Sequence, residues 1–533
     1  MSLDTIEINI AEVLAEIARV QPLWALLRLE DRARYMRRMA QAIVDELEDL
    51  RETIAEEQGR PRTEVVVLEL LPAIDALKWV AQDGARVLGG RRVGVHRSLF
   101  LTKRARIAYE PYGVVGVIGA GSAPFAQPLG QIAGALLAGN GVVFKPAPRA
   151  SLAGERIARV LARAGLPEGL VRVIHGGADV GVELARASVD KLLFTGSPAT
   201  GRAVARECVS HEKEVTVELG GKDAMLVLSD AHVGRAAAGA LWAGCAGAGQ
   251  ARGAVERVYA APEVMERLTA RLVAGARALK VGDPKDPGVQ MGPLASERRL
   301  EHVRELVDEA VAQGATLHCG GPVAPQGTNE SAALVELAAL TAGSAAGRED
   351  PAGVRVGPGA FYAPAILTGV THEMRVMREP VGGPVLAVME FDSVSEAIAL
   401  ANDSPYGLGA SVWTADRYRG MRIARELDAG MVWLNDHLPS PAVSRGPWGA
   451  AAGSGLGRTL GEAGLRACAQ EKLITWDPSG VRGVWWGPYD EVAARAAQAA
   501  TRLRSTREGD REAALRQGGA ALARAGLRAL GRR

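Results

Sequence analysis

The sequence predicts an α/β fold of two α/β domains, one with a doubly wound parallel sheet, together with a β-strand arm. Apolar residues recur at helical spacing from about residue 8 to residue 88. Strands, glycine-rich turns and helices then alternate from 113 to 217, and the alternation resumes after 252. Repeated βα units favour parallel strands with helices on both faces, so a ligand is expected at the carboxyl ends of the strands.

The N-terminal helices are interrupted once and lead into an extended region. The helical pattern of ARYMRRMAQAIVDELEDLRETIAEE breaks at 59–61 and resumes in TEVVVLELLPAIDALKWVAQ. Residues 91–113 are rich in β-forming residues that alternate with polar ones, which predicts a pair of strands extending away from the body.

Each α/β domain contains several segments of clear strand or helix pattern. In the first domain the predicted strands are GVVGVIGAG, GVVFKPAP, VRVIHGG and KLLFTGS, and the predicted helices are QPLGQIAGALLAG and GERIARVLARAGL. In the second domain ERVYAAP predicts a strand, and EVMERLTARLVAGARAL and RLEHVRELVDEAVAQGA predict helices. Residues 322–359 are rich in Ala, Gly and Pro, which predicts a surface insertion with a helical pattern in ESAALVELAAL.

Composition and charge exclude several classes of function. The chain has 533 residues, of which 48% are apolar, and a formal net charge of +2, so its overall charge does not favour binding to nucleic acid or to a membrane. The N-terminus carries acidic residues where a signal peptide needs basic ones, and no uncharged apolar stretch reaches the roughly 18 residues of a membrane span. The four cysteines are widely scattered and the histidines are not clustered, which favours a reducing cytoplasm and no metal site.

Two segments, VELGGK at 217–222 and GQARGAVERVY at 249–259, contain the most informative residues. With FTGSPATG at 194–201, GDPKDPGVQMGPL, and the stretch from REPVGGPV to PWGAAAGSGLGR, they closely resemble the NAD(P)-dependent aldehyde dehydrogenase superfamily. The resemblance runs in order from Ala11 to about Trp476. It implies a Rossmann-type domain in which the glycines of FTGSPATG let a pyrophosphate approach a helix N-terminus.

The same resemblance identifies a missing nucleophile. In this family a thiolate attacks the aldehyde, hydride leaves to the nicotinamide, and a glutamate activates the water that hydrolyses the thioester. Glu218 stands at the glutamate position and could act as a residual general base, but 34 residues later the cysteine position holds Arg252. A guanidinium cannot form the covalent adduct. Cys245, the nearest thiol in the sequence, would lie about 10 Å from Arg252 if the segment were helical, and is expected to be a small buried residue.

Other positions implied by the resemblance are altered as well. Ser122 stands where the family has an asparagine that stabilises the oxyanion, and Gly121 stands where it has a tryptophan. Pro148 and Pro380 replace two acidic residues that bind ribose hydroxyls, and Gly382 replaces a phenylalanine that packs on the nicotinamide. The residues still expected to contact a cofactor are Lys145, Gly196, Ser197, Gly201, Leu219 and Glu379. Binding of NAD or NADP is therefore expected to be weakened or lost.

Two arrangements of Arg252 and two classes of function follow from these changes. We expect Arg252 to fill the space of the missing thiol and to form an ion pair with Glu218; the alternative is an arginine that reaches solvent along the substrate tunnel. Because independent parts of one reaction centre are altered together, the favoured function is that of a pseudoenzyme with a scaffold, regulatory or nucleotide-binding role. The other function is an NAD(P)-dependent oxidoreductase that oxidises aldehydes through a rearranged site using Glu218.

The resemblance also divides the chain and implies its assembly. It assigns 1–96 and 114–244 to the dinucleotide-binding domain, and 245–464 to a catalytic-type domain. An oligomerisation arm is expected from 97–113 and 465–477, in which CAQEKLITW supplies the partner strand. These features imply a homodimer or tetramer, or pairing with an active relative.

Residues 478–533 form a basic extension with eleven Arg and five acidic residues. It contains two helical patterns. Its aromatic residues Trp485, Trp486 and Tyr489 are expected to pack on the core or on a neighbouring subunit. The alternative is a basic amphipathic helix that binds an anionic membrane or a partner.

Overall fold

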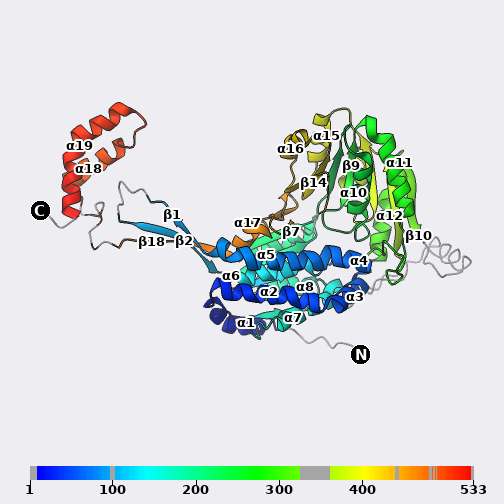
Figure 1. The fold of residues 1–533 in the computed structure, drawn as a ribbon, viewed down its shortest axis with the longest axis horizontal. Helices are drawn as coiled ribbons and strands as arrows, with labels where there is room; N and C mark the ends of the chain where they lie inside the picture. Colours follow the sequence, from blue (N-terminus) through cyan, green and yellow to red (C-terminus); the bar gives the residue numbers. More distant parts are fainter. Residues whose placement is uncertain are drawn as a thin grey trace, which may run out of the picture. The chain divides into compact units, whose positions relative to one another are not determined.

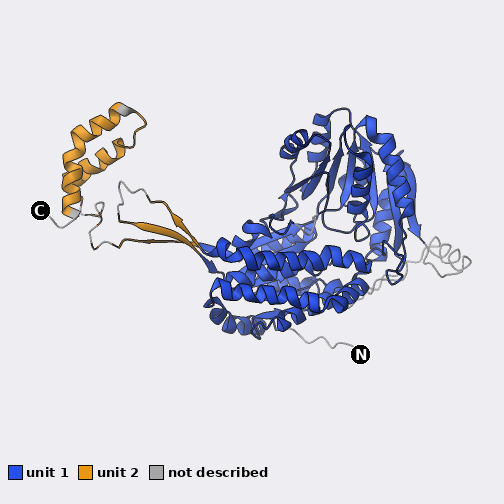
Figure 2. Ribbon diagram, viewed as in Figure 1, with its two compact units in different colours: residues 1–89, 109–471 blue, residues 90–108, 472–533 orange. Residues whose placement is uncertain are grey.

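The computed structural model describes residues 9–95, 102–323, 360–438, 443–478, 480, 483, 486–487 and 489–529. The chain forms two compact units, Met1–Gly89 with Tyr109–Glu471 and Gly90–Ala108 with Lys472–Arg533 (Figure 2). Most of the insertion predicted at 322–359, and Trp485 of the extension, lie outside the described residues. In the described part of the chain, no helix is long and apolar enough to cross a membrane.

The predicted N-terminal helical region is confirmed. Its helices are α1 (Ile10–Ala25), α2 (Leu29–Asp45), α3 (Leu47–Gln58), α4 (Arg62–Val65) and α5 (Leu71–Leu88), with a π-helical turn at Val66–Leu70. Helix α3 ends because Gly59 adopts a left-handed φ of 64°. Helices α2 and α5 lie side by side (Figure 1), and their buried side chains, among them Met36, Ile43 and Leu77, form one core with helix α6 (Ala126–Ala138).

The first α/β part contains a six-stranded sheet of order β17-β7-β6-β3-β4-β5. Its strands are β3 (Val114–Ile118), β4 (Gly141–Lys145), β5 (Val171–Val173), β6 (Lys191–Gly196), β7 (Glu214–Leu219) and β17 (Gly455–Leu456), and its helices are α6 (Ala126–Ala138), α7 (Ser151–Arg163), α8 (Ala178–Arg186) and α9 (Pro198–Ser210). Strands β3 to β7 pair in parallel, and the order reverses at β3, with β4 on one side and β6 on the other. This is the predicted doubly wound sheet.

The second α/β part contains a seven-stranded sheet of order β10-β11-β12-β9-β8-β14-β15. Its strands are β8 (Asp223–Val227), β9 (Val255–Ala260), β10 (Thr316–Val323), β11 (Phe361–Thr368), β12 (Val385–Glu390), β14 (Gly409–Trp413) and β15 (Met431–Leu434). Its helices are α10 (Val233–Cys245), α11 (Pro262–Ala278), α12 (Glu297–Ala312), α14 (Arg375–Arg378), α15 (Val394–Asn402) and α16 (Arg417–Glu426). All its pairings are parallel except that of β10 with β11.

The chain passes from the first sheet to the second between β7 and β8. Strand β8 pairs with β9 and β14 of the second sheet, so the chain changes sheets at 220–222, directly after β7. The remaining elements of this unit are β13 (Tyr406–Gly407), which lies between α15 and β14 and pairs with β16 (Ala451–Ala452), and α17 (Gly461–Arg466).

The arm is a three-stranded sheet of order β1-β2-β18, formed by β1 (Arg91–Val93), β2 (Arg104–Pro111) and β18 (Ala469–Trp476) (Figure 1). The partner strand predicted in CAQEKLITW is therefore confirmed. The arm begins at 91, earlier than the predicted start at 97, because β1 pairs antiparallel with β2.

The extension forms the helical hairpin α18 (Glu491–Arg502) and α19 (Glu508–Ala529). The two helices approach closely through small residues: a Cβ added to Gly518 would lie 2.1 Å from Cβ of Ala499. Asp490 caps α18 by accepting a hydrogen bond from the amide of Ala493, and it also forms an ion pair with Arg528 of α19.

Candidate functional site

Two turns bring Glu218 and Arg252 together. Glu218 lies near the carboxyl end of β7, just before the change of sheet. Helix α10 ends at Cys245, and the following turn has positive φ at 247, 248 and 249. A Cβ on Gly249 would lie 2.2 Å from the carbonyl carbon of Gly383, so this position accepts no side chain. Because the turn is not helical, the 10 Å separation expected for a helix does not apply; Cys245 itself is buried, as predicted.

The predicted ion pair is present. Nη1 of Arg252 donates to Oε2 of Glu218 at 2.5 Å, and the side chains are 8% and 1% exposed. Nε of Arg252 donates to the carbonyl of Leu219 at 3.0 Å, and the guanidinium lies 5.5 Å from the ring centroid of Trp448. The alternative arrangement, an arginine that reaches solvent, is wrong for this structure.

Two further side chains hold Glu218. Nε2 of Gln127 donates to Oε2 at 2.6 Å and also to Thr195 at 2.6 Å, while the hydroxyl of Thr459 donates to Oε1. Burial raises the pKa of Glu218, and the charge of Arg252 is the largest influence opposing that shift. Burial likewise lowers the pKa of Arg252, which the charge of Glu218 opposes. Both oxygens of the carboxylate are therefore occupied by protein donors.

A second buried carboxyl group, that of Asp223, lies near Arg252, since its Oδ2 is 3.6 Å from the place of a Cβ on Gly253. Asp223 is 2% exposed, and among the described residues no side-chain donor lies within hydrogen-bond distance of its oxygens. Burial raises its pKa to about 8. Nε2 of His437 is 3.9 Å from Oδ2 and binds instead to the carbonyl of Gly253, while Nδ1 binds Ser411 at 2.8 Å. Burial lowers the pKa of His437 to about 3, so this imidazole is neutral.

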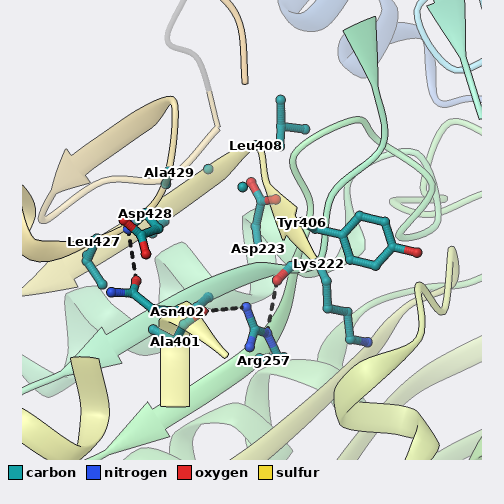
Figure 3. Close-up of a pocket in the computed structure, with 14 residues that line it drawn as sticks. Lys222, Asp223, Arg257, Ala401, Asn402, Tyr406, Leu408, Leu427, Asp428 and Ala429 are labelled. Carbon is teal, nitrogen blue, oxygen red and sulfur yellow. Dashed lines mark hydrogen bonds between the residues drawn. The ribbon is translucent and has the colours of Figure 1, made fainter. Parts of the chain in front are cut away.

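Asp223 lines a pocket together with Lys222 and Arg257 (Figure 3), and both of these cations already have partners. Nζ of Lys222 donates to Glu256 and to the carbonyl of Val376, each at 2.7 Å. Arg257 donates to the carbonyls of Lys222 and of Ala401. The contacts between Lys222, Glu256 and Arg257 lie at the starts of β8 and β9, and none of them reaches the carboxyl oxygens of Asp223.

Ser122 is not joined to the ion pair by a hydrogen bond in the described structure. Its carbonyl accepts a 2.6 Å hydrogen bond from Nη2 of Arg60, whose Nη1 pairs with Glu69 at 3.1 Å. Glu69 in turn accepts from the first amides of α6, at Phe125 and Ala126. The loop at the oxyanion position is thus held through its backbone.

The residues predicted for the adenosine half of a cofactor lie at the carboxyl ends of β4 and β6. Lys145 is 3% exposed, its Nζ donates to the carbonyl of Pro146 at 3.4 Å, and burial lowers its pKa. Ser197 caps α9, accepting a hydrogen bond from the amide of Thr200. Gly196 ends β6, and its absent side chain leaves room for the ring of Phe194, since a Cβ there would lie 2.6 Å from it.

Gly201 and Leu219 pack closely against each other. A Cβ on Gly201 would lie 2.1 Å from Cδ2 of Leu219, so the glycine lets α9 pack against β7. This close contact joins the dinucleotide turn to the strand that carries Glu218.

The two positions predicted at the nicotinamide end, Glu379 and Gly382, each lie beside an arginine side chain. Glu379 accepts from Nε and Nη2 of Arg375 at 2.8 and 3.1 Å. Gly382 has a φ of 59°, and a Cβ there would lie 2.9 Å from Nη1 of Arg299. Glu379 is therefore engaged by an arginine of its own helix, and Arg299 occupies the side-chain space at Gly382.

Comparison with known proteins identifies the family of this chain. The family model described as "Aldehyde dehydrogenase family" matches residues 6–342 and 333–474. The 4,4'-diapolycopene aldehyde oxidase of Methylomonas sp is 36% identical over 456 residues, 86% of this chain and 79% of that protein. The betaine aldehyde dehydrogenase of Cereibacter sphaeroides is 35% identical over 466 residues, 87% of this chain and 88% of that protein.

Solved structures show the same fold. The aldehyde dehydrogenase of Mycobacterium tuberculosis in complex with NAD+ superposes with a TM-score of 0.77 at 30% identity, covering 86% of this chain and 88% of that one. The aldehyde dehydrogenase of Brucella melitensis biovar abortus superposes with a TM-score of 0.77 at 29% identity, covering 88% and 89%. With these matches spanning both sheets and the arm, the chain belongs to the aldehyde dehydrogenase family.

Proposed function

We propose that this member of the family does not oxidise aldehydes and serves instead as a scaffold, regulatory or ligand-binding protein. The observation that carries the proposal is the buried ion pair of Glu218 with Arg252. The guanidinium occupies the position of the nucleophile and stays protonated, so this position supplies no group that can attack an aldehyde.

The contacts of Glu218 also argue against a role as general base. A general base must have an oxygen within hydrogen-bond reach of the water that it deprotonates. Oε2 already accepts from Arg252 and Gln127, and Oε1 accepts from Thr459. Each carboxylate oxygen can accept two hydrogen bonds, so Oε2 is filled and a water could bind only at Oε1, in a site where the Glu218 side chain is 1% exposed.

The residues present do not fit the nicotinamide end of NAD or NADP. Glu379 is held by Arg375, Pro380 offers no side-chain acceptor, and Arg299 fills the space at Gly382. The turn at Ser197 and the helix α9 that follows it still fit a pyrophosphate. We therefore propose that binding of the whole dinucleotide is weakened or lost, and no catalytic step is assigned to it.

The proposed assembly is a homodimer or tetramer. Strand β18 is the outer strand of the arm, and Leu473, Ile474 and Trp476 on it are 62%, 38% and 45% exposed. An edge strand with apolar side chains favours pairing with a second chain. The four free cysteines support a reducing compartment, the cytoplasm.

A turnover assay tests the loss of activity. The purified chain is mixed with NAD or NADP and a panel of short, long and aromatic aldehydes that includes betaine aldehyde, and formation of the reduced nicotinamide is followed. We expect none, and an active betaine aldehyde dehydrogenase serves as the positive control. The Arg252→Cys variant should restore little activity, because the contacts at the nicotinamide end stay altered. Turnover that disappears in Glu218→Gln would instead support the alternative, an oxidoreductase with a rearranged site.

A further inference from the structure

Nη2 of Arg252 has no acceptor among the described residues, and a carboxyl group without a side-chain donor lies near it. Nη1 and Nε of the guanidinium donate to Glu218 and to the carbonyl of Leu219, whereas Nη2 is buried and unpaired. The oxygens of Asp223 are buried too, and none of the described side chains donates to them. Buried polar groups normally have hydrogen-bond partners, so the two unpaired groups require a physical explanation.

Glycines surround the carboxyl group of Asp223, and one of them is the neighbour of Arg252 in the chain. A Cβ on Gly221 or Gly409 would lie 2.3 Å from one of its oxygens, and a Cβ on Gly253 would lie 3.6 Å from Oδ2. Consecutive Cα atoms are about 3.8 Å apart, which puts Oδ2 at most about 9 Å from Cα of Arg252. An extended arginine side chain with one hydrogen bond at its end covers this distance.

Trp448 borders both groups. Its Cη2 is 4.0 Å from the place of a Cβ on Gly253, and the guanidinium carbon of Arg252 is 5.5 Å from its ring centroid. The face of an indole ring attracts a cation at this distance. A guanidinium that moved from Glu218 to Asp223 would change its position over the ring, so Trp448 can report the movement.

The buried charged groups that surround Asp223 already have partners. Lys222 donates to Glu256, and Arg257 donates to backbone carbonyls. His437 is 3.9 Å from Oδ2 and is neutral. Burial raises the pKa of Asp223 to about 8, so this carboxyl keeps its proton at neutral pH and releases it in alkaline solution. The pocket of Asp223 is also lined by the titratable side chains of Tyr406 and Asp428.

An ionised Asp223 would need the guanidinium more than Glu218 does. Glu218 also accepts hydrogen bonds from Gln127 and Thr459, whereas Asp223 has no side-chain donor in the described structure. Leaving a buried carboxylate unpaired costs more free energy than removing one of several donors from another carboxylate. Two buried carboxylates that compete for Arg252 would therefore not share it equally.

We propose that Arg252 acts as an alkaline switch: it pairs with Glu218 while Asp223 is protonated, and its guanidinium moves to Asp223 when that proton passes to solvent. Below the transition the site holds one cation and one anion. Above the transition Asp223 gains a charged donor, and one acceptor position on Oε2 of Glu218 becomes free for a water molecule. The switch deepens the proposed regulatory function and rests on it, since it takes Arg252 as the resident partner of Glu218.

Tryptophan fluorescence of the full chain, recorded from pH 6 to pH 10 without aldehyde or nicotinamide, tests the switch. The contribution of Trp448 is the difference between each protein and the same protein with Trp448→Phe. We expect this contribution to change with a midpoint near pH 8 and expect Asp223→Asn to abolish the change. In Glu218→Gln no second carboxylate competes for Arg252, and a nearby cation favours the ionised form of Asp223, so the midpoint should fall by about one pH unit or more.

The control Glu46→Gln makes the same chemical change at another buried glutamate, which pairs with Arg159 and Arg163 of α7. It should leave the midpoint within about 0.3 pH units of the wild-type value. The switch is overturned if the wild type shows no transition, if Asp223→Asn retains it, or if Glu218→Gln moves the midpoint no further than Glu46→Gln does.

Crystal structures at pH 6 and pH 9.5 measure the movement directly. A guanidinium that contacts Asp223 at pH 9.5 supports the proposal, and one that stays on Glu218 at both pH values overturns it. None of these measurements involves turnover, so failure of the switch leaves the separate test of aldehyde oxidation unaffected.

Discussion

Replacing Arg252 by methionine would remove the charge of the buried pair and keep much of its volume. Glu218, 1% exposed, would then lose the cation 2.5 Å from its oxygen. Breaking a buried ion pair by removing one partner costs about 3 to 5 kcal/mol, because the other charge stays desolvated. We therefore expect Arg252→Met to lose about that much stability at pH 8, where an unpaired Glu218 must either remain charged or take up a proton.

The pH dependence of this loss follows from the direction of the pKa shift. Burial already raises the pKa of Glu218, and removing Arg252, the largest influence opposing that shift, raises it further. A carboxyl whose folded pKa lies above its unfolded pKa binds more protons in the folded state, so stability falls as pH rises between the two values. The deficit of Arg252→Met should thus be smaller at pH 5 than at pH 8.

Thermal denaturation of the wild type, Arg252→Met, Glu218→Gln and the double variant measures the coupling between the two residues. In the double variant neither charge remains, so it should be more stable at pH 8 than either single variant. Arg298→Ala, an exposed substitution on α12, is the control and should leave the unfolding temperature nearly unchanged. Additive effects in the double variant, or a deficit of Arg252→Met that is equal at both pH values, would refute the reasoning.

Three other outcomes are expected. Burial raises the pKa of Asp223 to about 8, so this residue should contribute a fall in stability of about 1.4 kcal/mol per pH unit between its unfolded pKa and pH 8. Asp223→Asn should remove this contribution in denaturation curves recorded from pH 5 to pH 9. Gly249→Ala should lower the unfolding temperature more than Gly314→Ala, since both residues have positive φ but only a Cβ at 249 would meet the backbone, 2.2 Å from Gly383. Gln127→Ala should destabilise by about 1 to 3 kcal/mol, because it leaves a buried oxygen of Glu218 with one donor fewer, and the same melts measure it.

Much of the fold follows from local pattern. The N-terminal helices, the strands of the first sheet and the partner strand of the arm each have a clear period or a glycine turn in the sequence, and the structure has all of them. The sequence does not show where the chain passes from the first sheet to the second, because DAMLV, the strand β8, is a buried apolar run like its predecessors. Periodicity identifies such a strand, but it does not tell which of two sheets the strand joins.

Only part of the candidate site could be predicted from the sequence. The pair of Glu218 and Arg252 could be expected, because the family resemblance places both positions in one reaction centre and their charges are opposite. Gln127 and Thr459 could not, since they lie 91 and 241 residues from Glu218 in the chain and carry no sequence signal of their own. Whether a polar side chain reaches a buried carboxylate depends on the packing of the strands and helices that carry it.

The three donors around Glu218 also bear on how such a protein could evolve. A mutation that returned cysteine to position 252 would supply sulfur, yet Gln127 and Thr459 would still hold the carboxylate away from water. Under the proposed loss of aldehyde oxidation, this one substitution would not restore the activity. A lineage with this arrangement would have to make several neutral or harmful changes before gaining any benefit, so its departure from the ancestral chemistry would tend to be permanent.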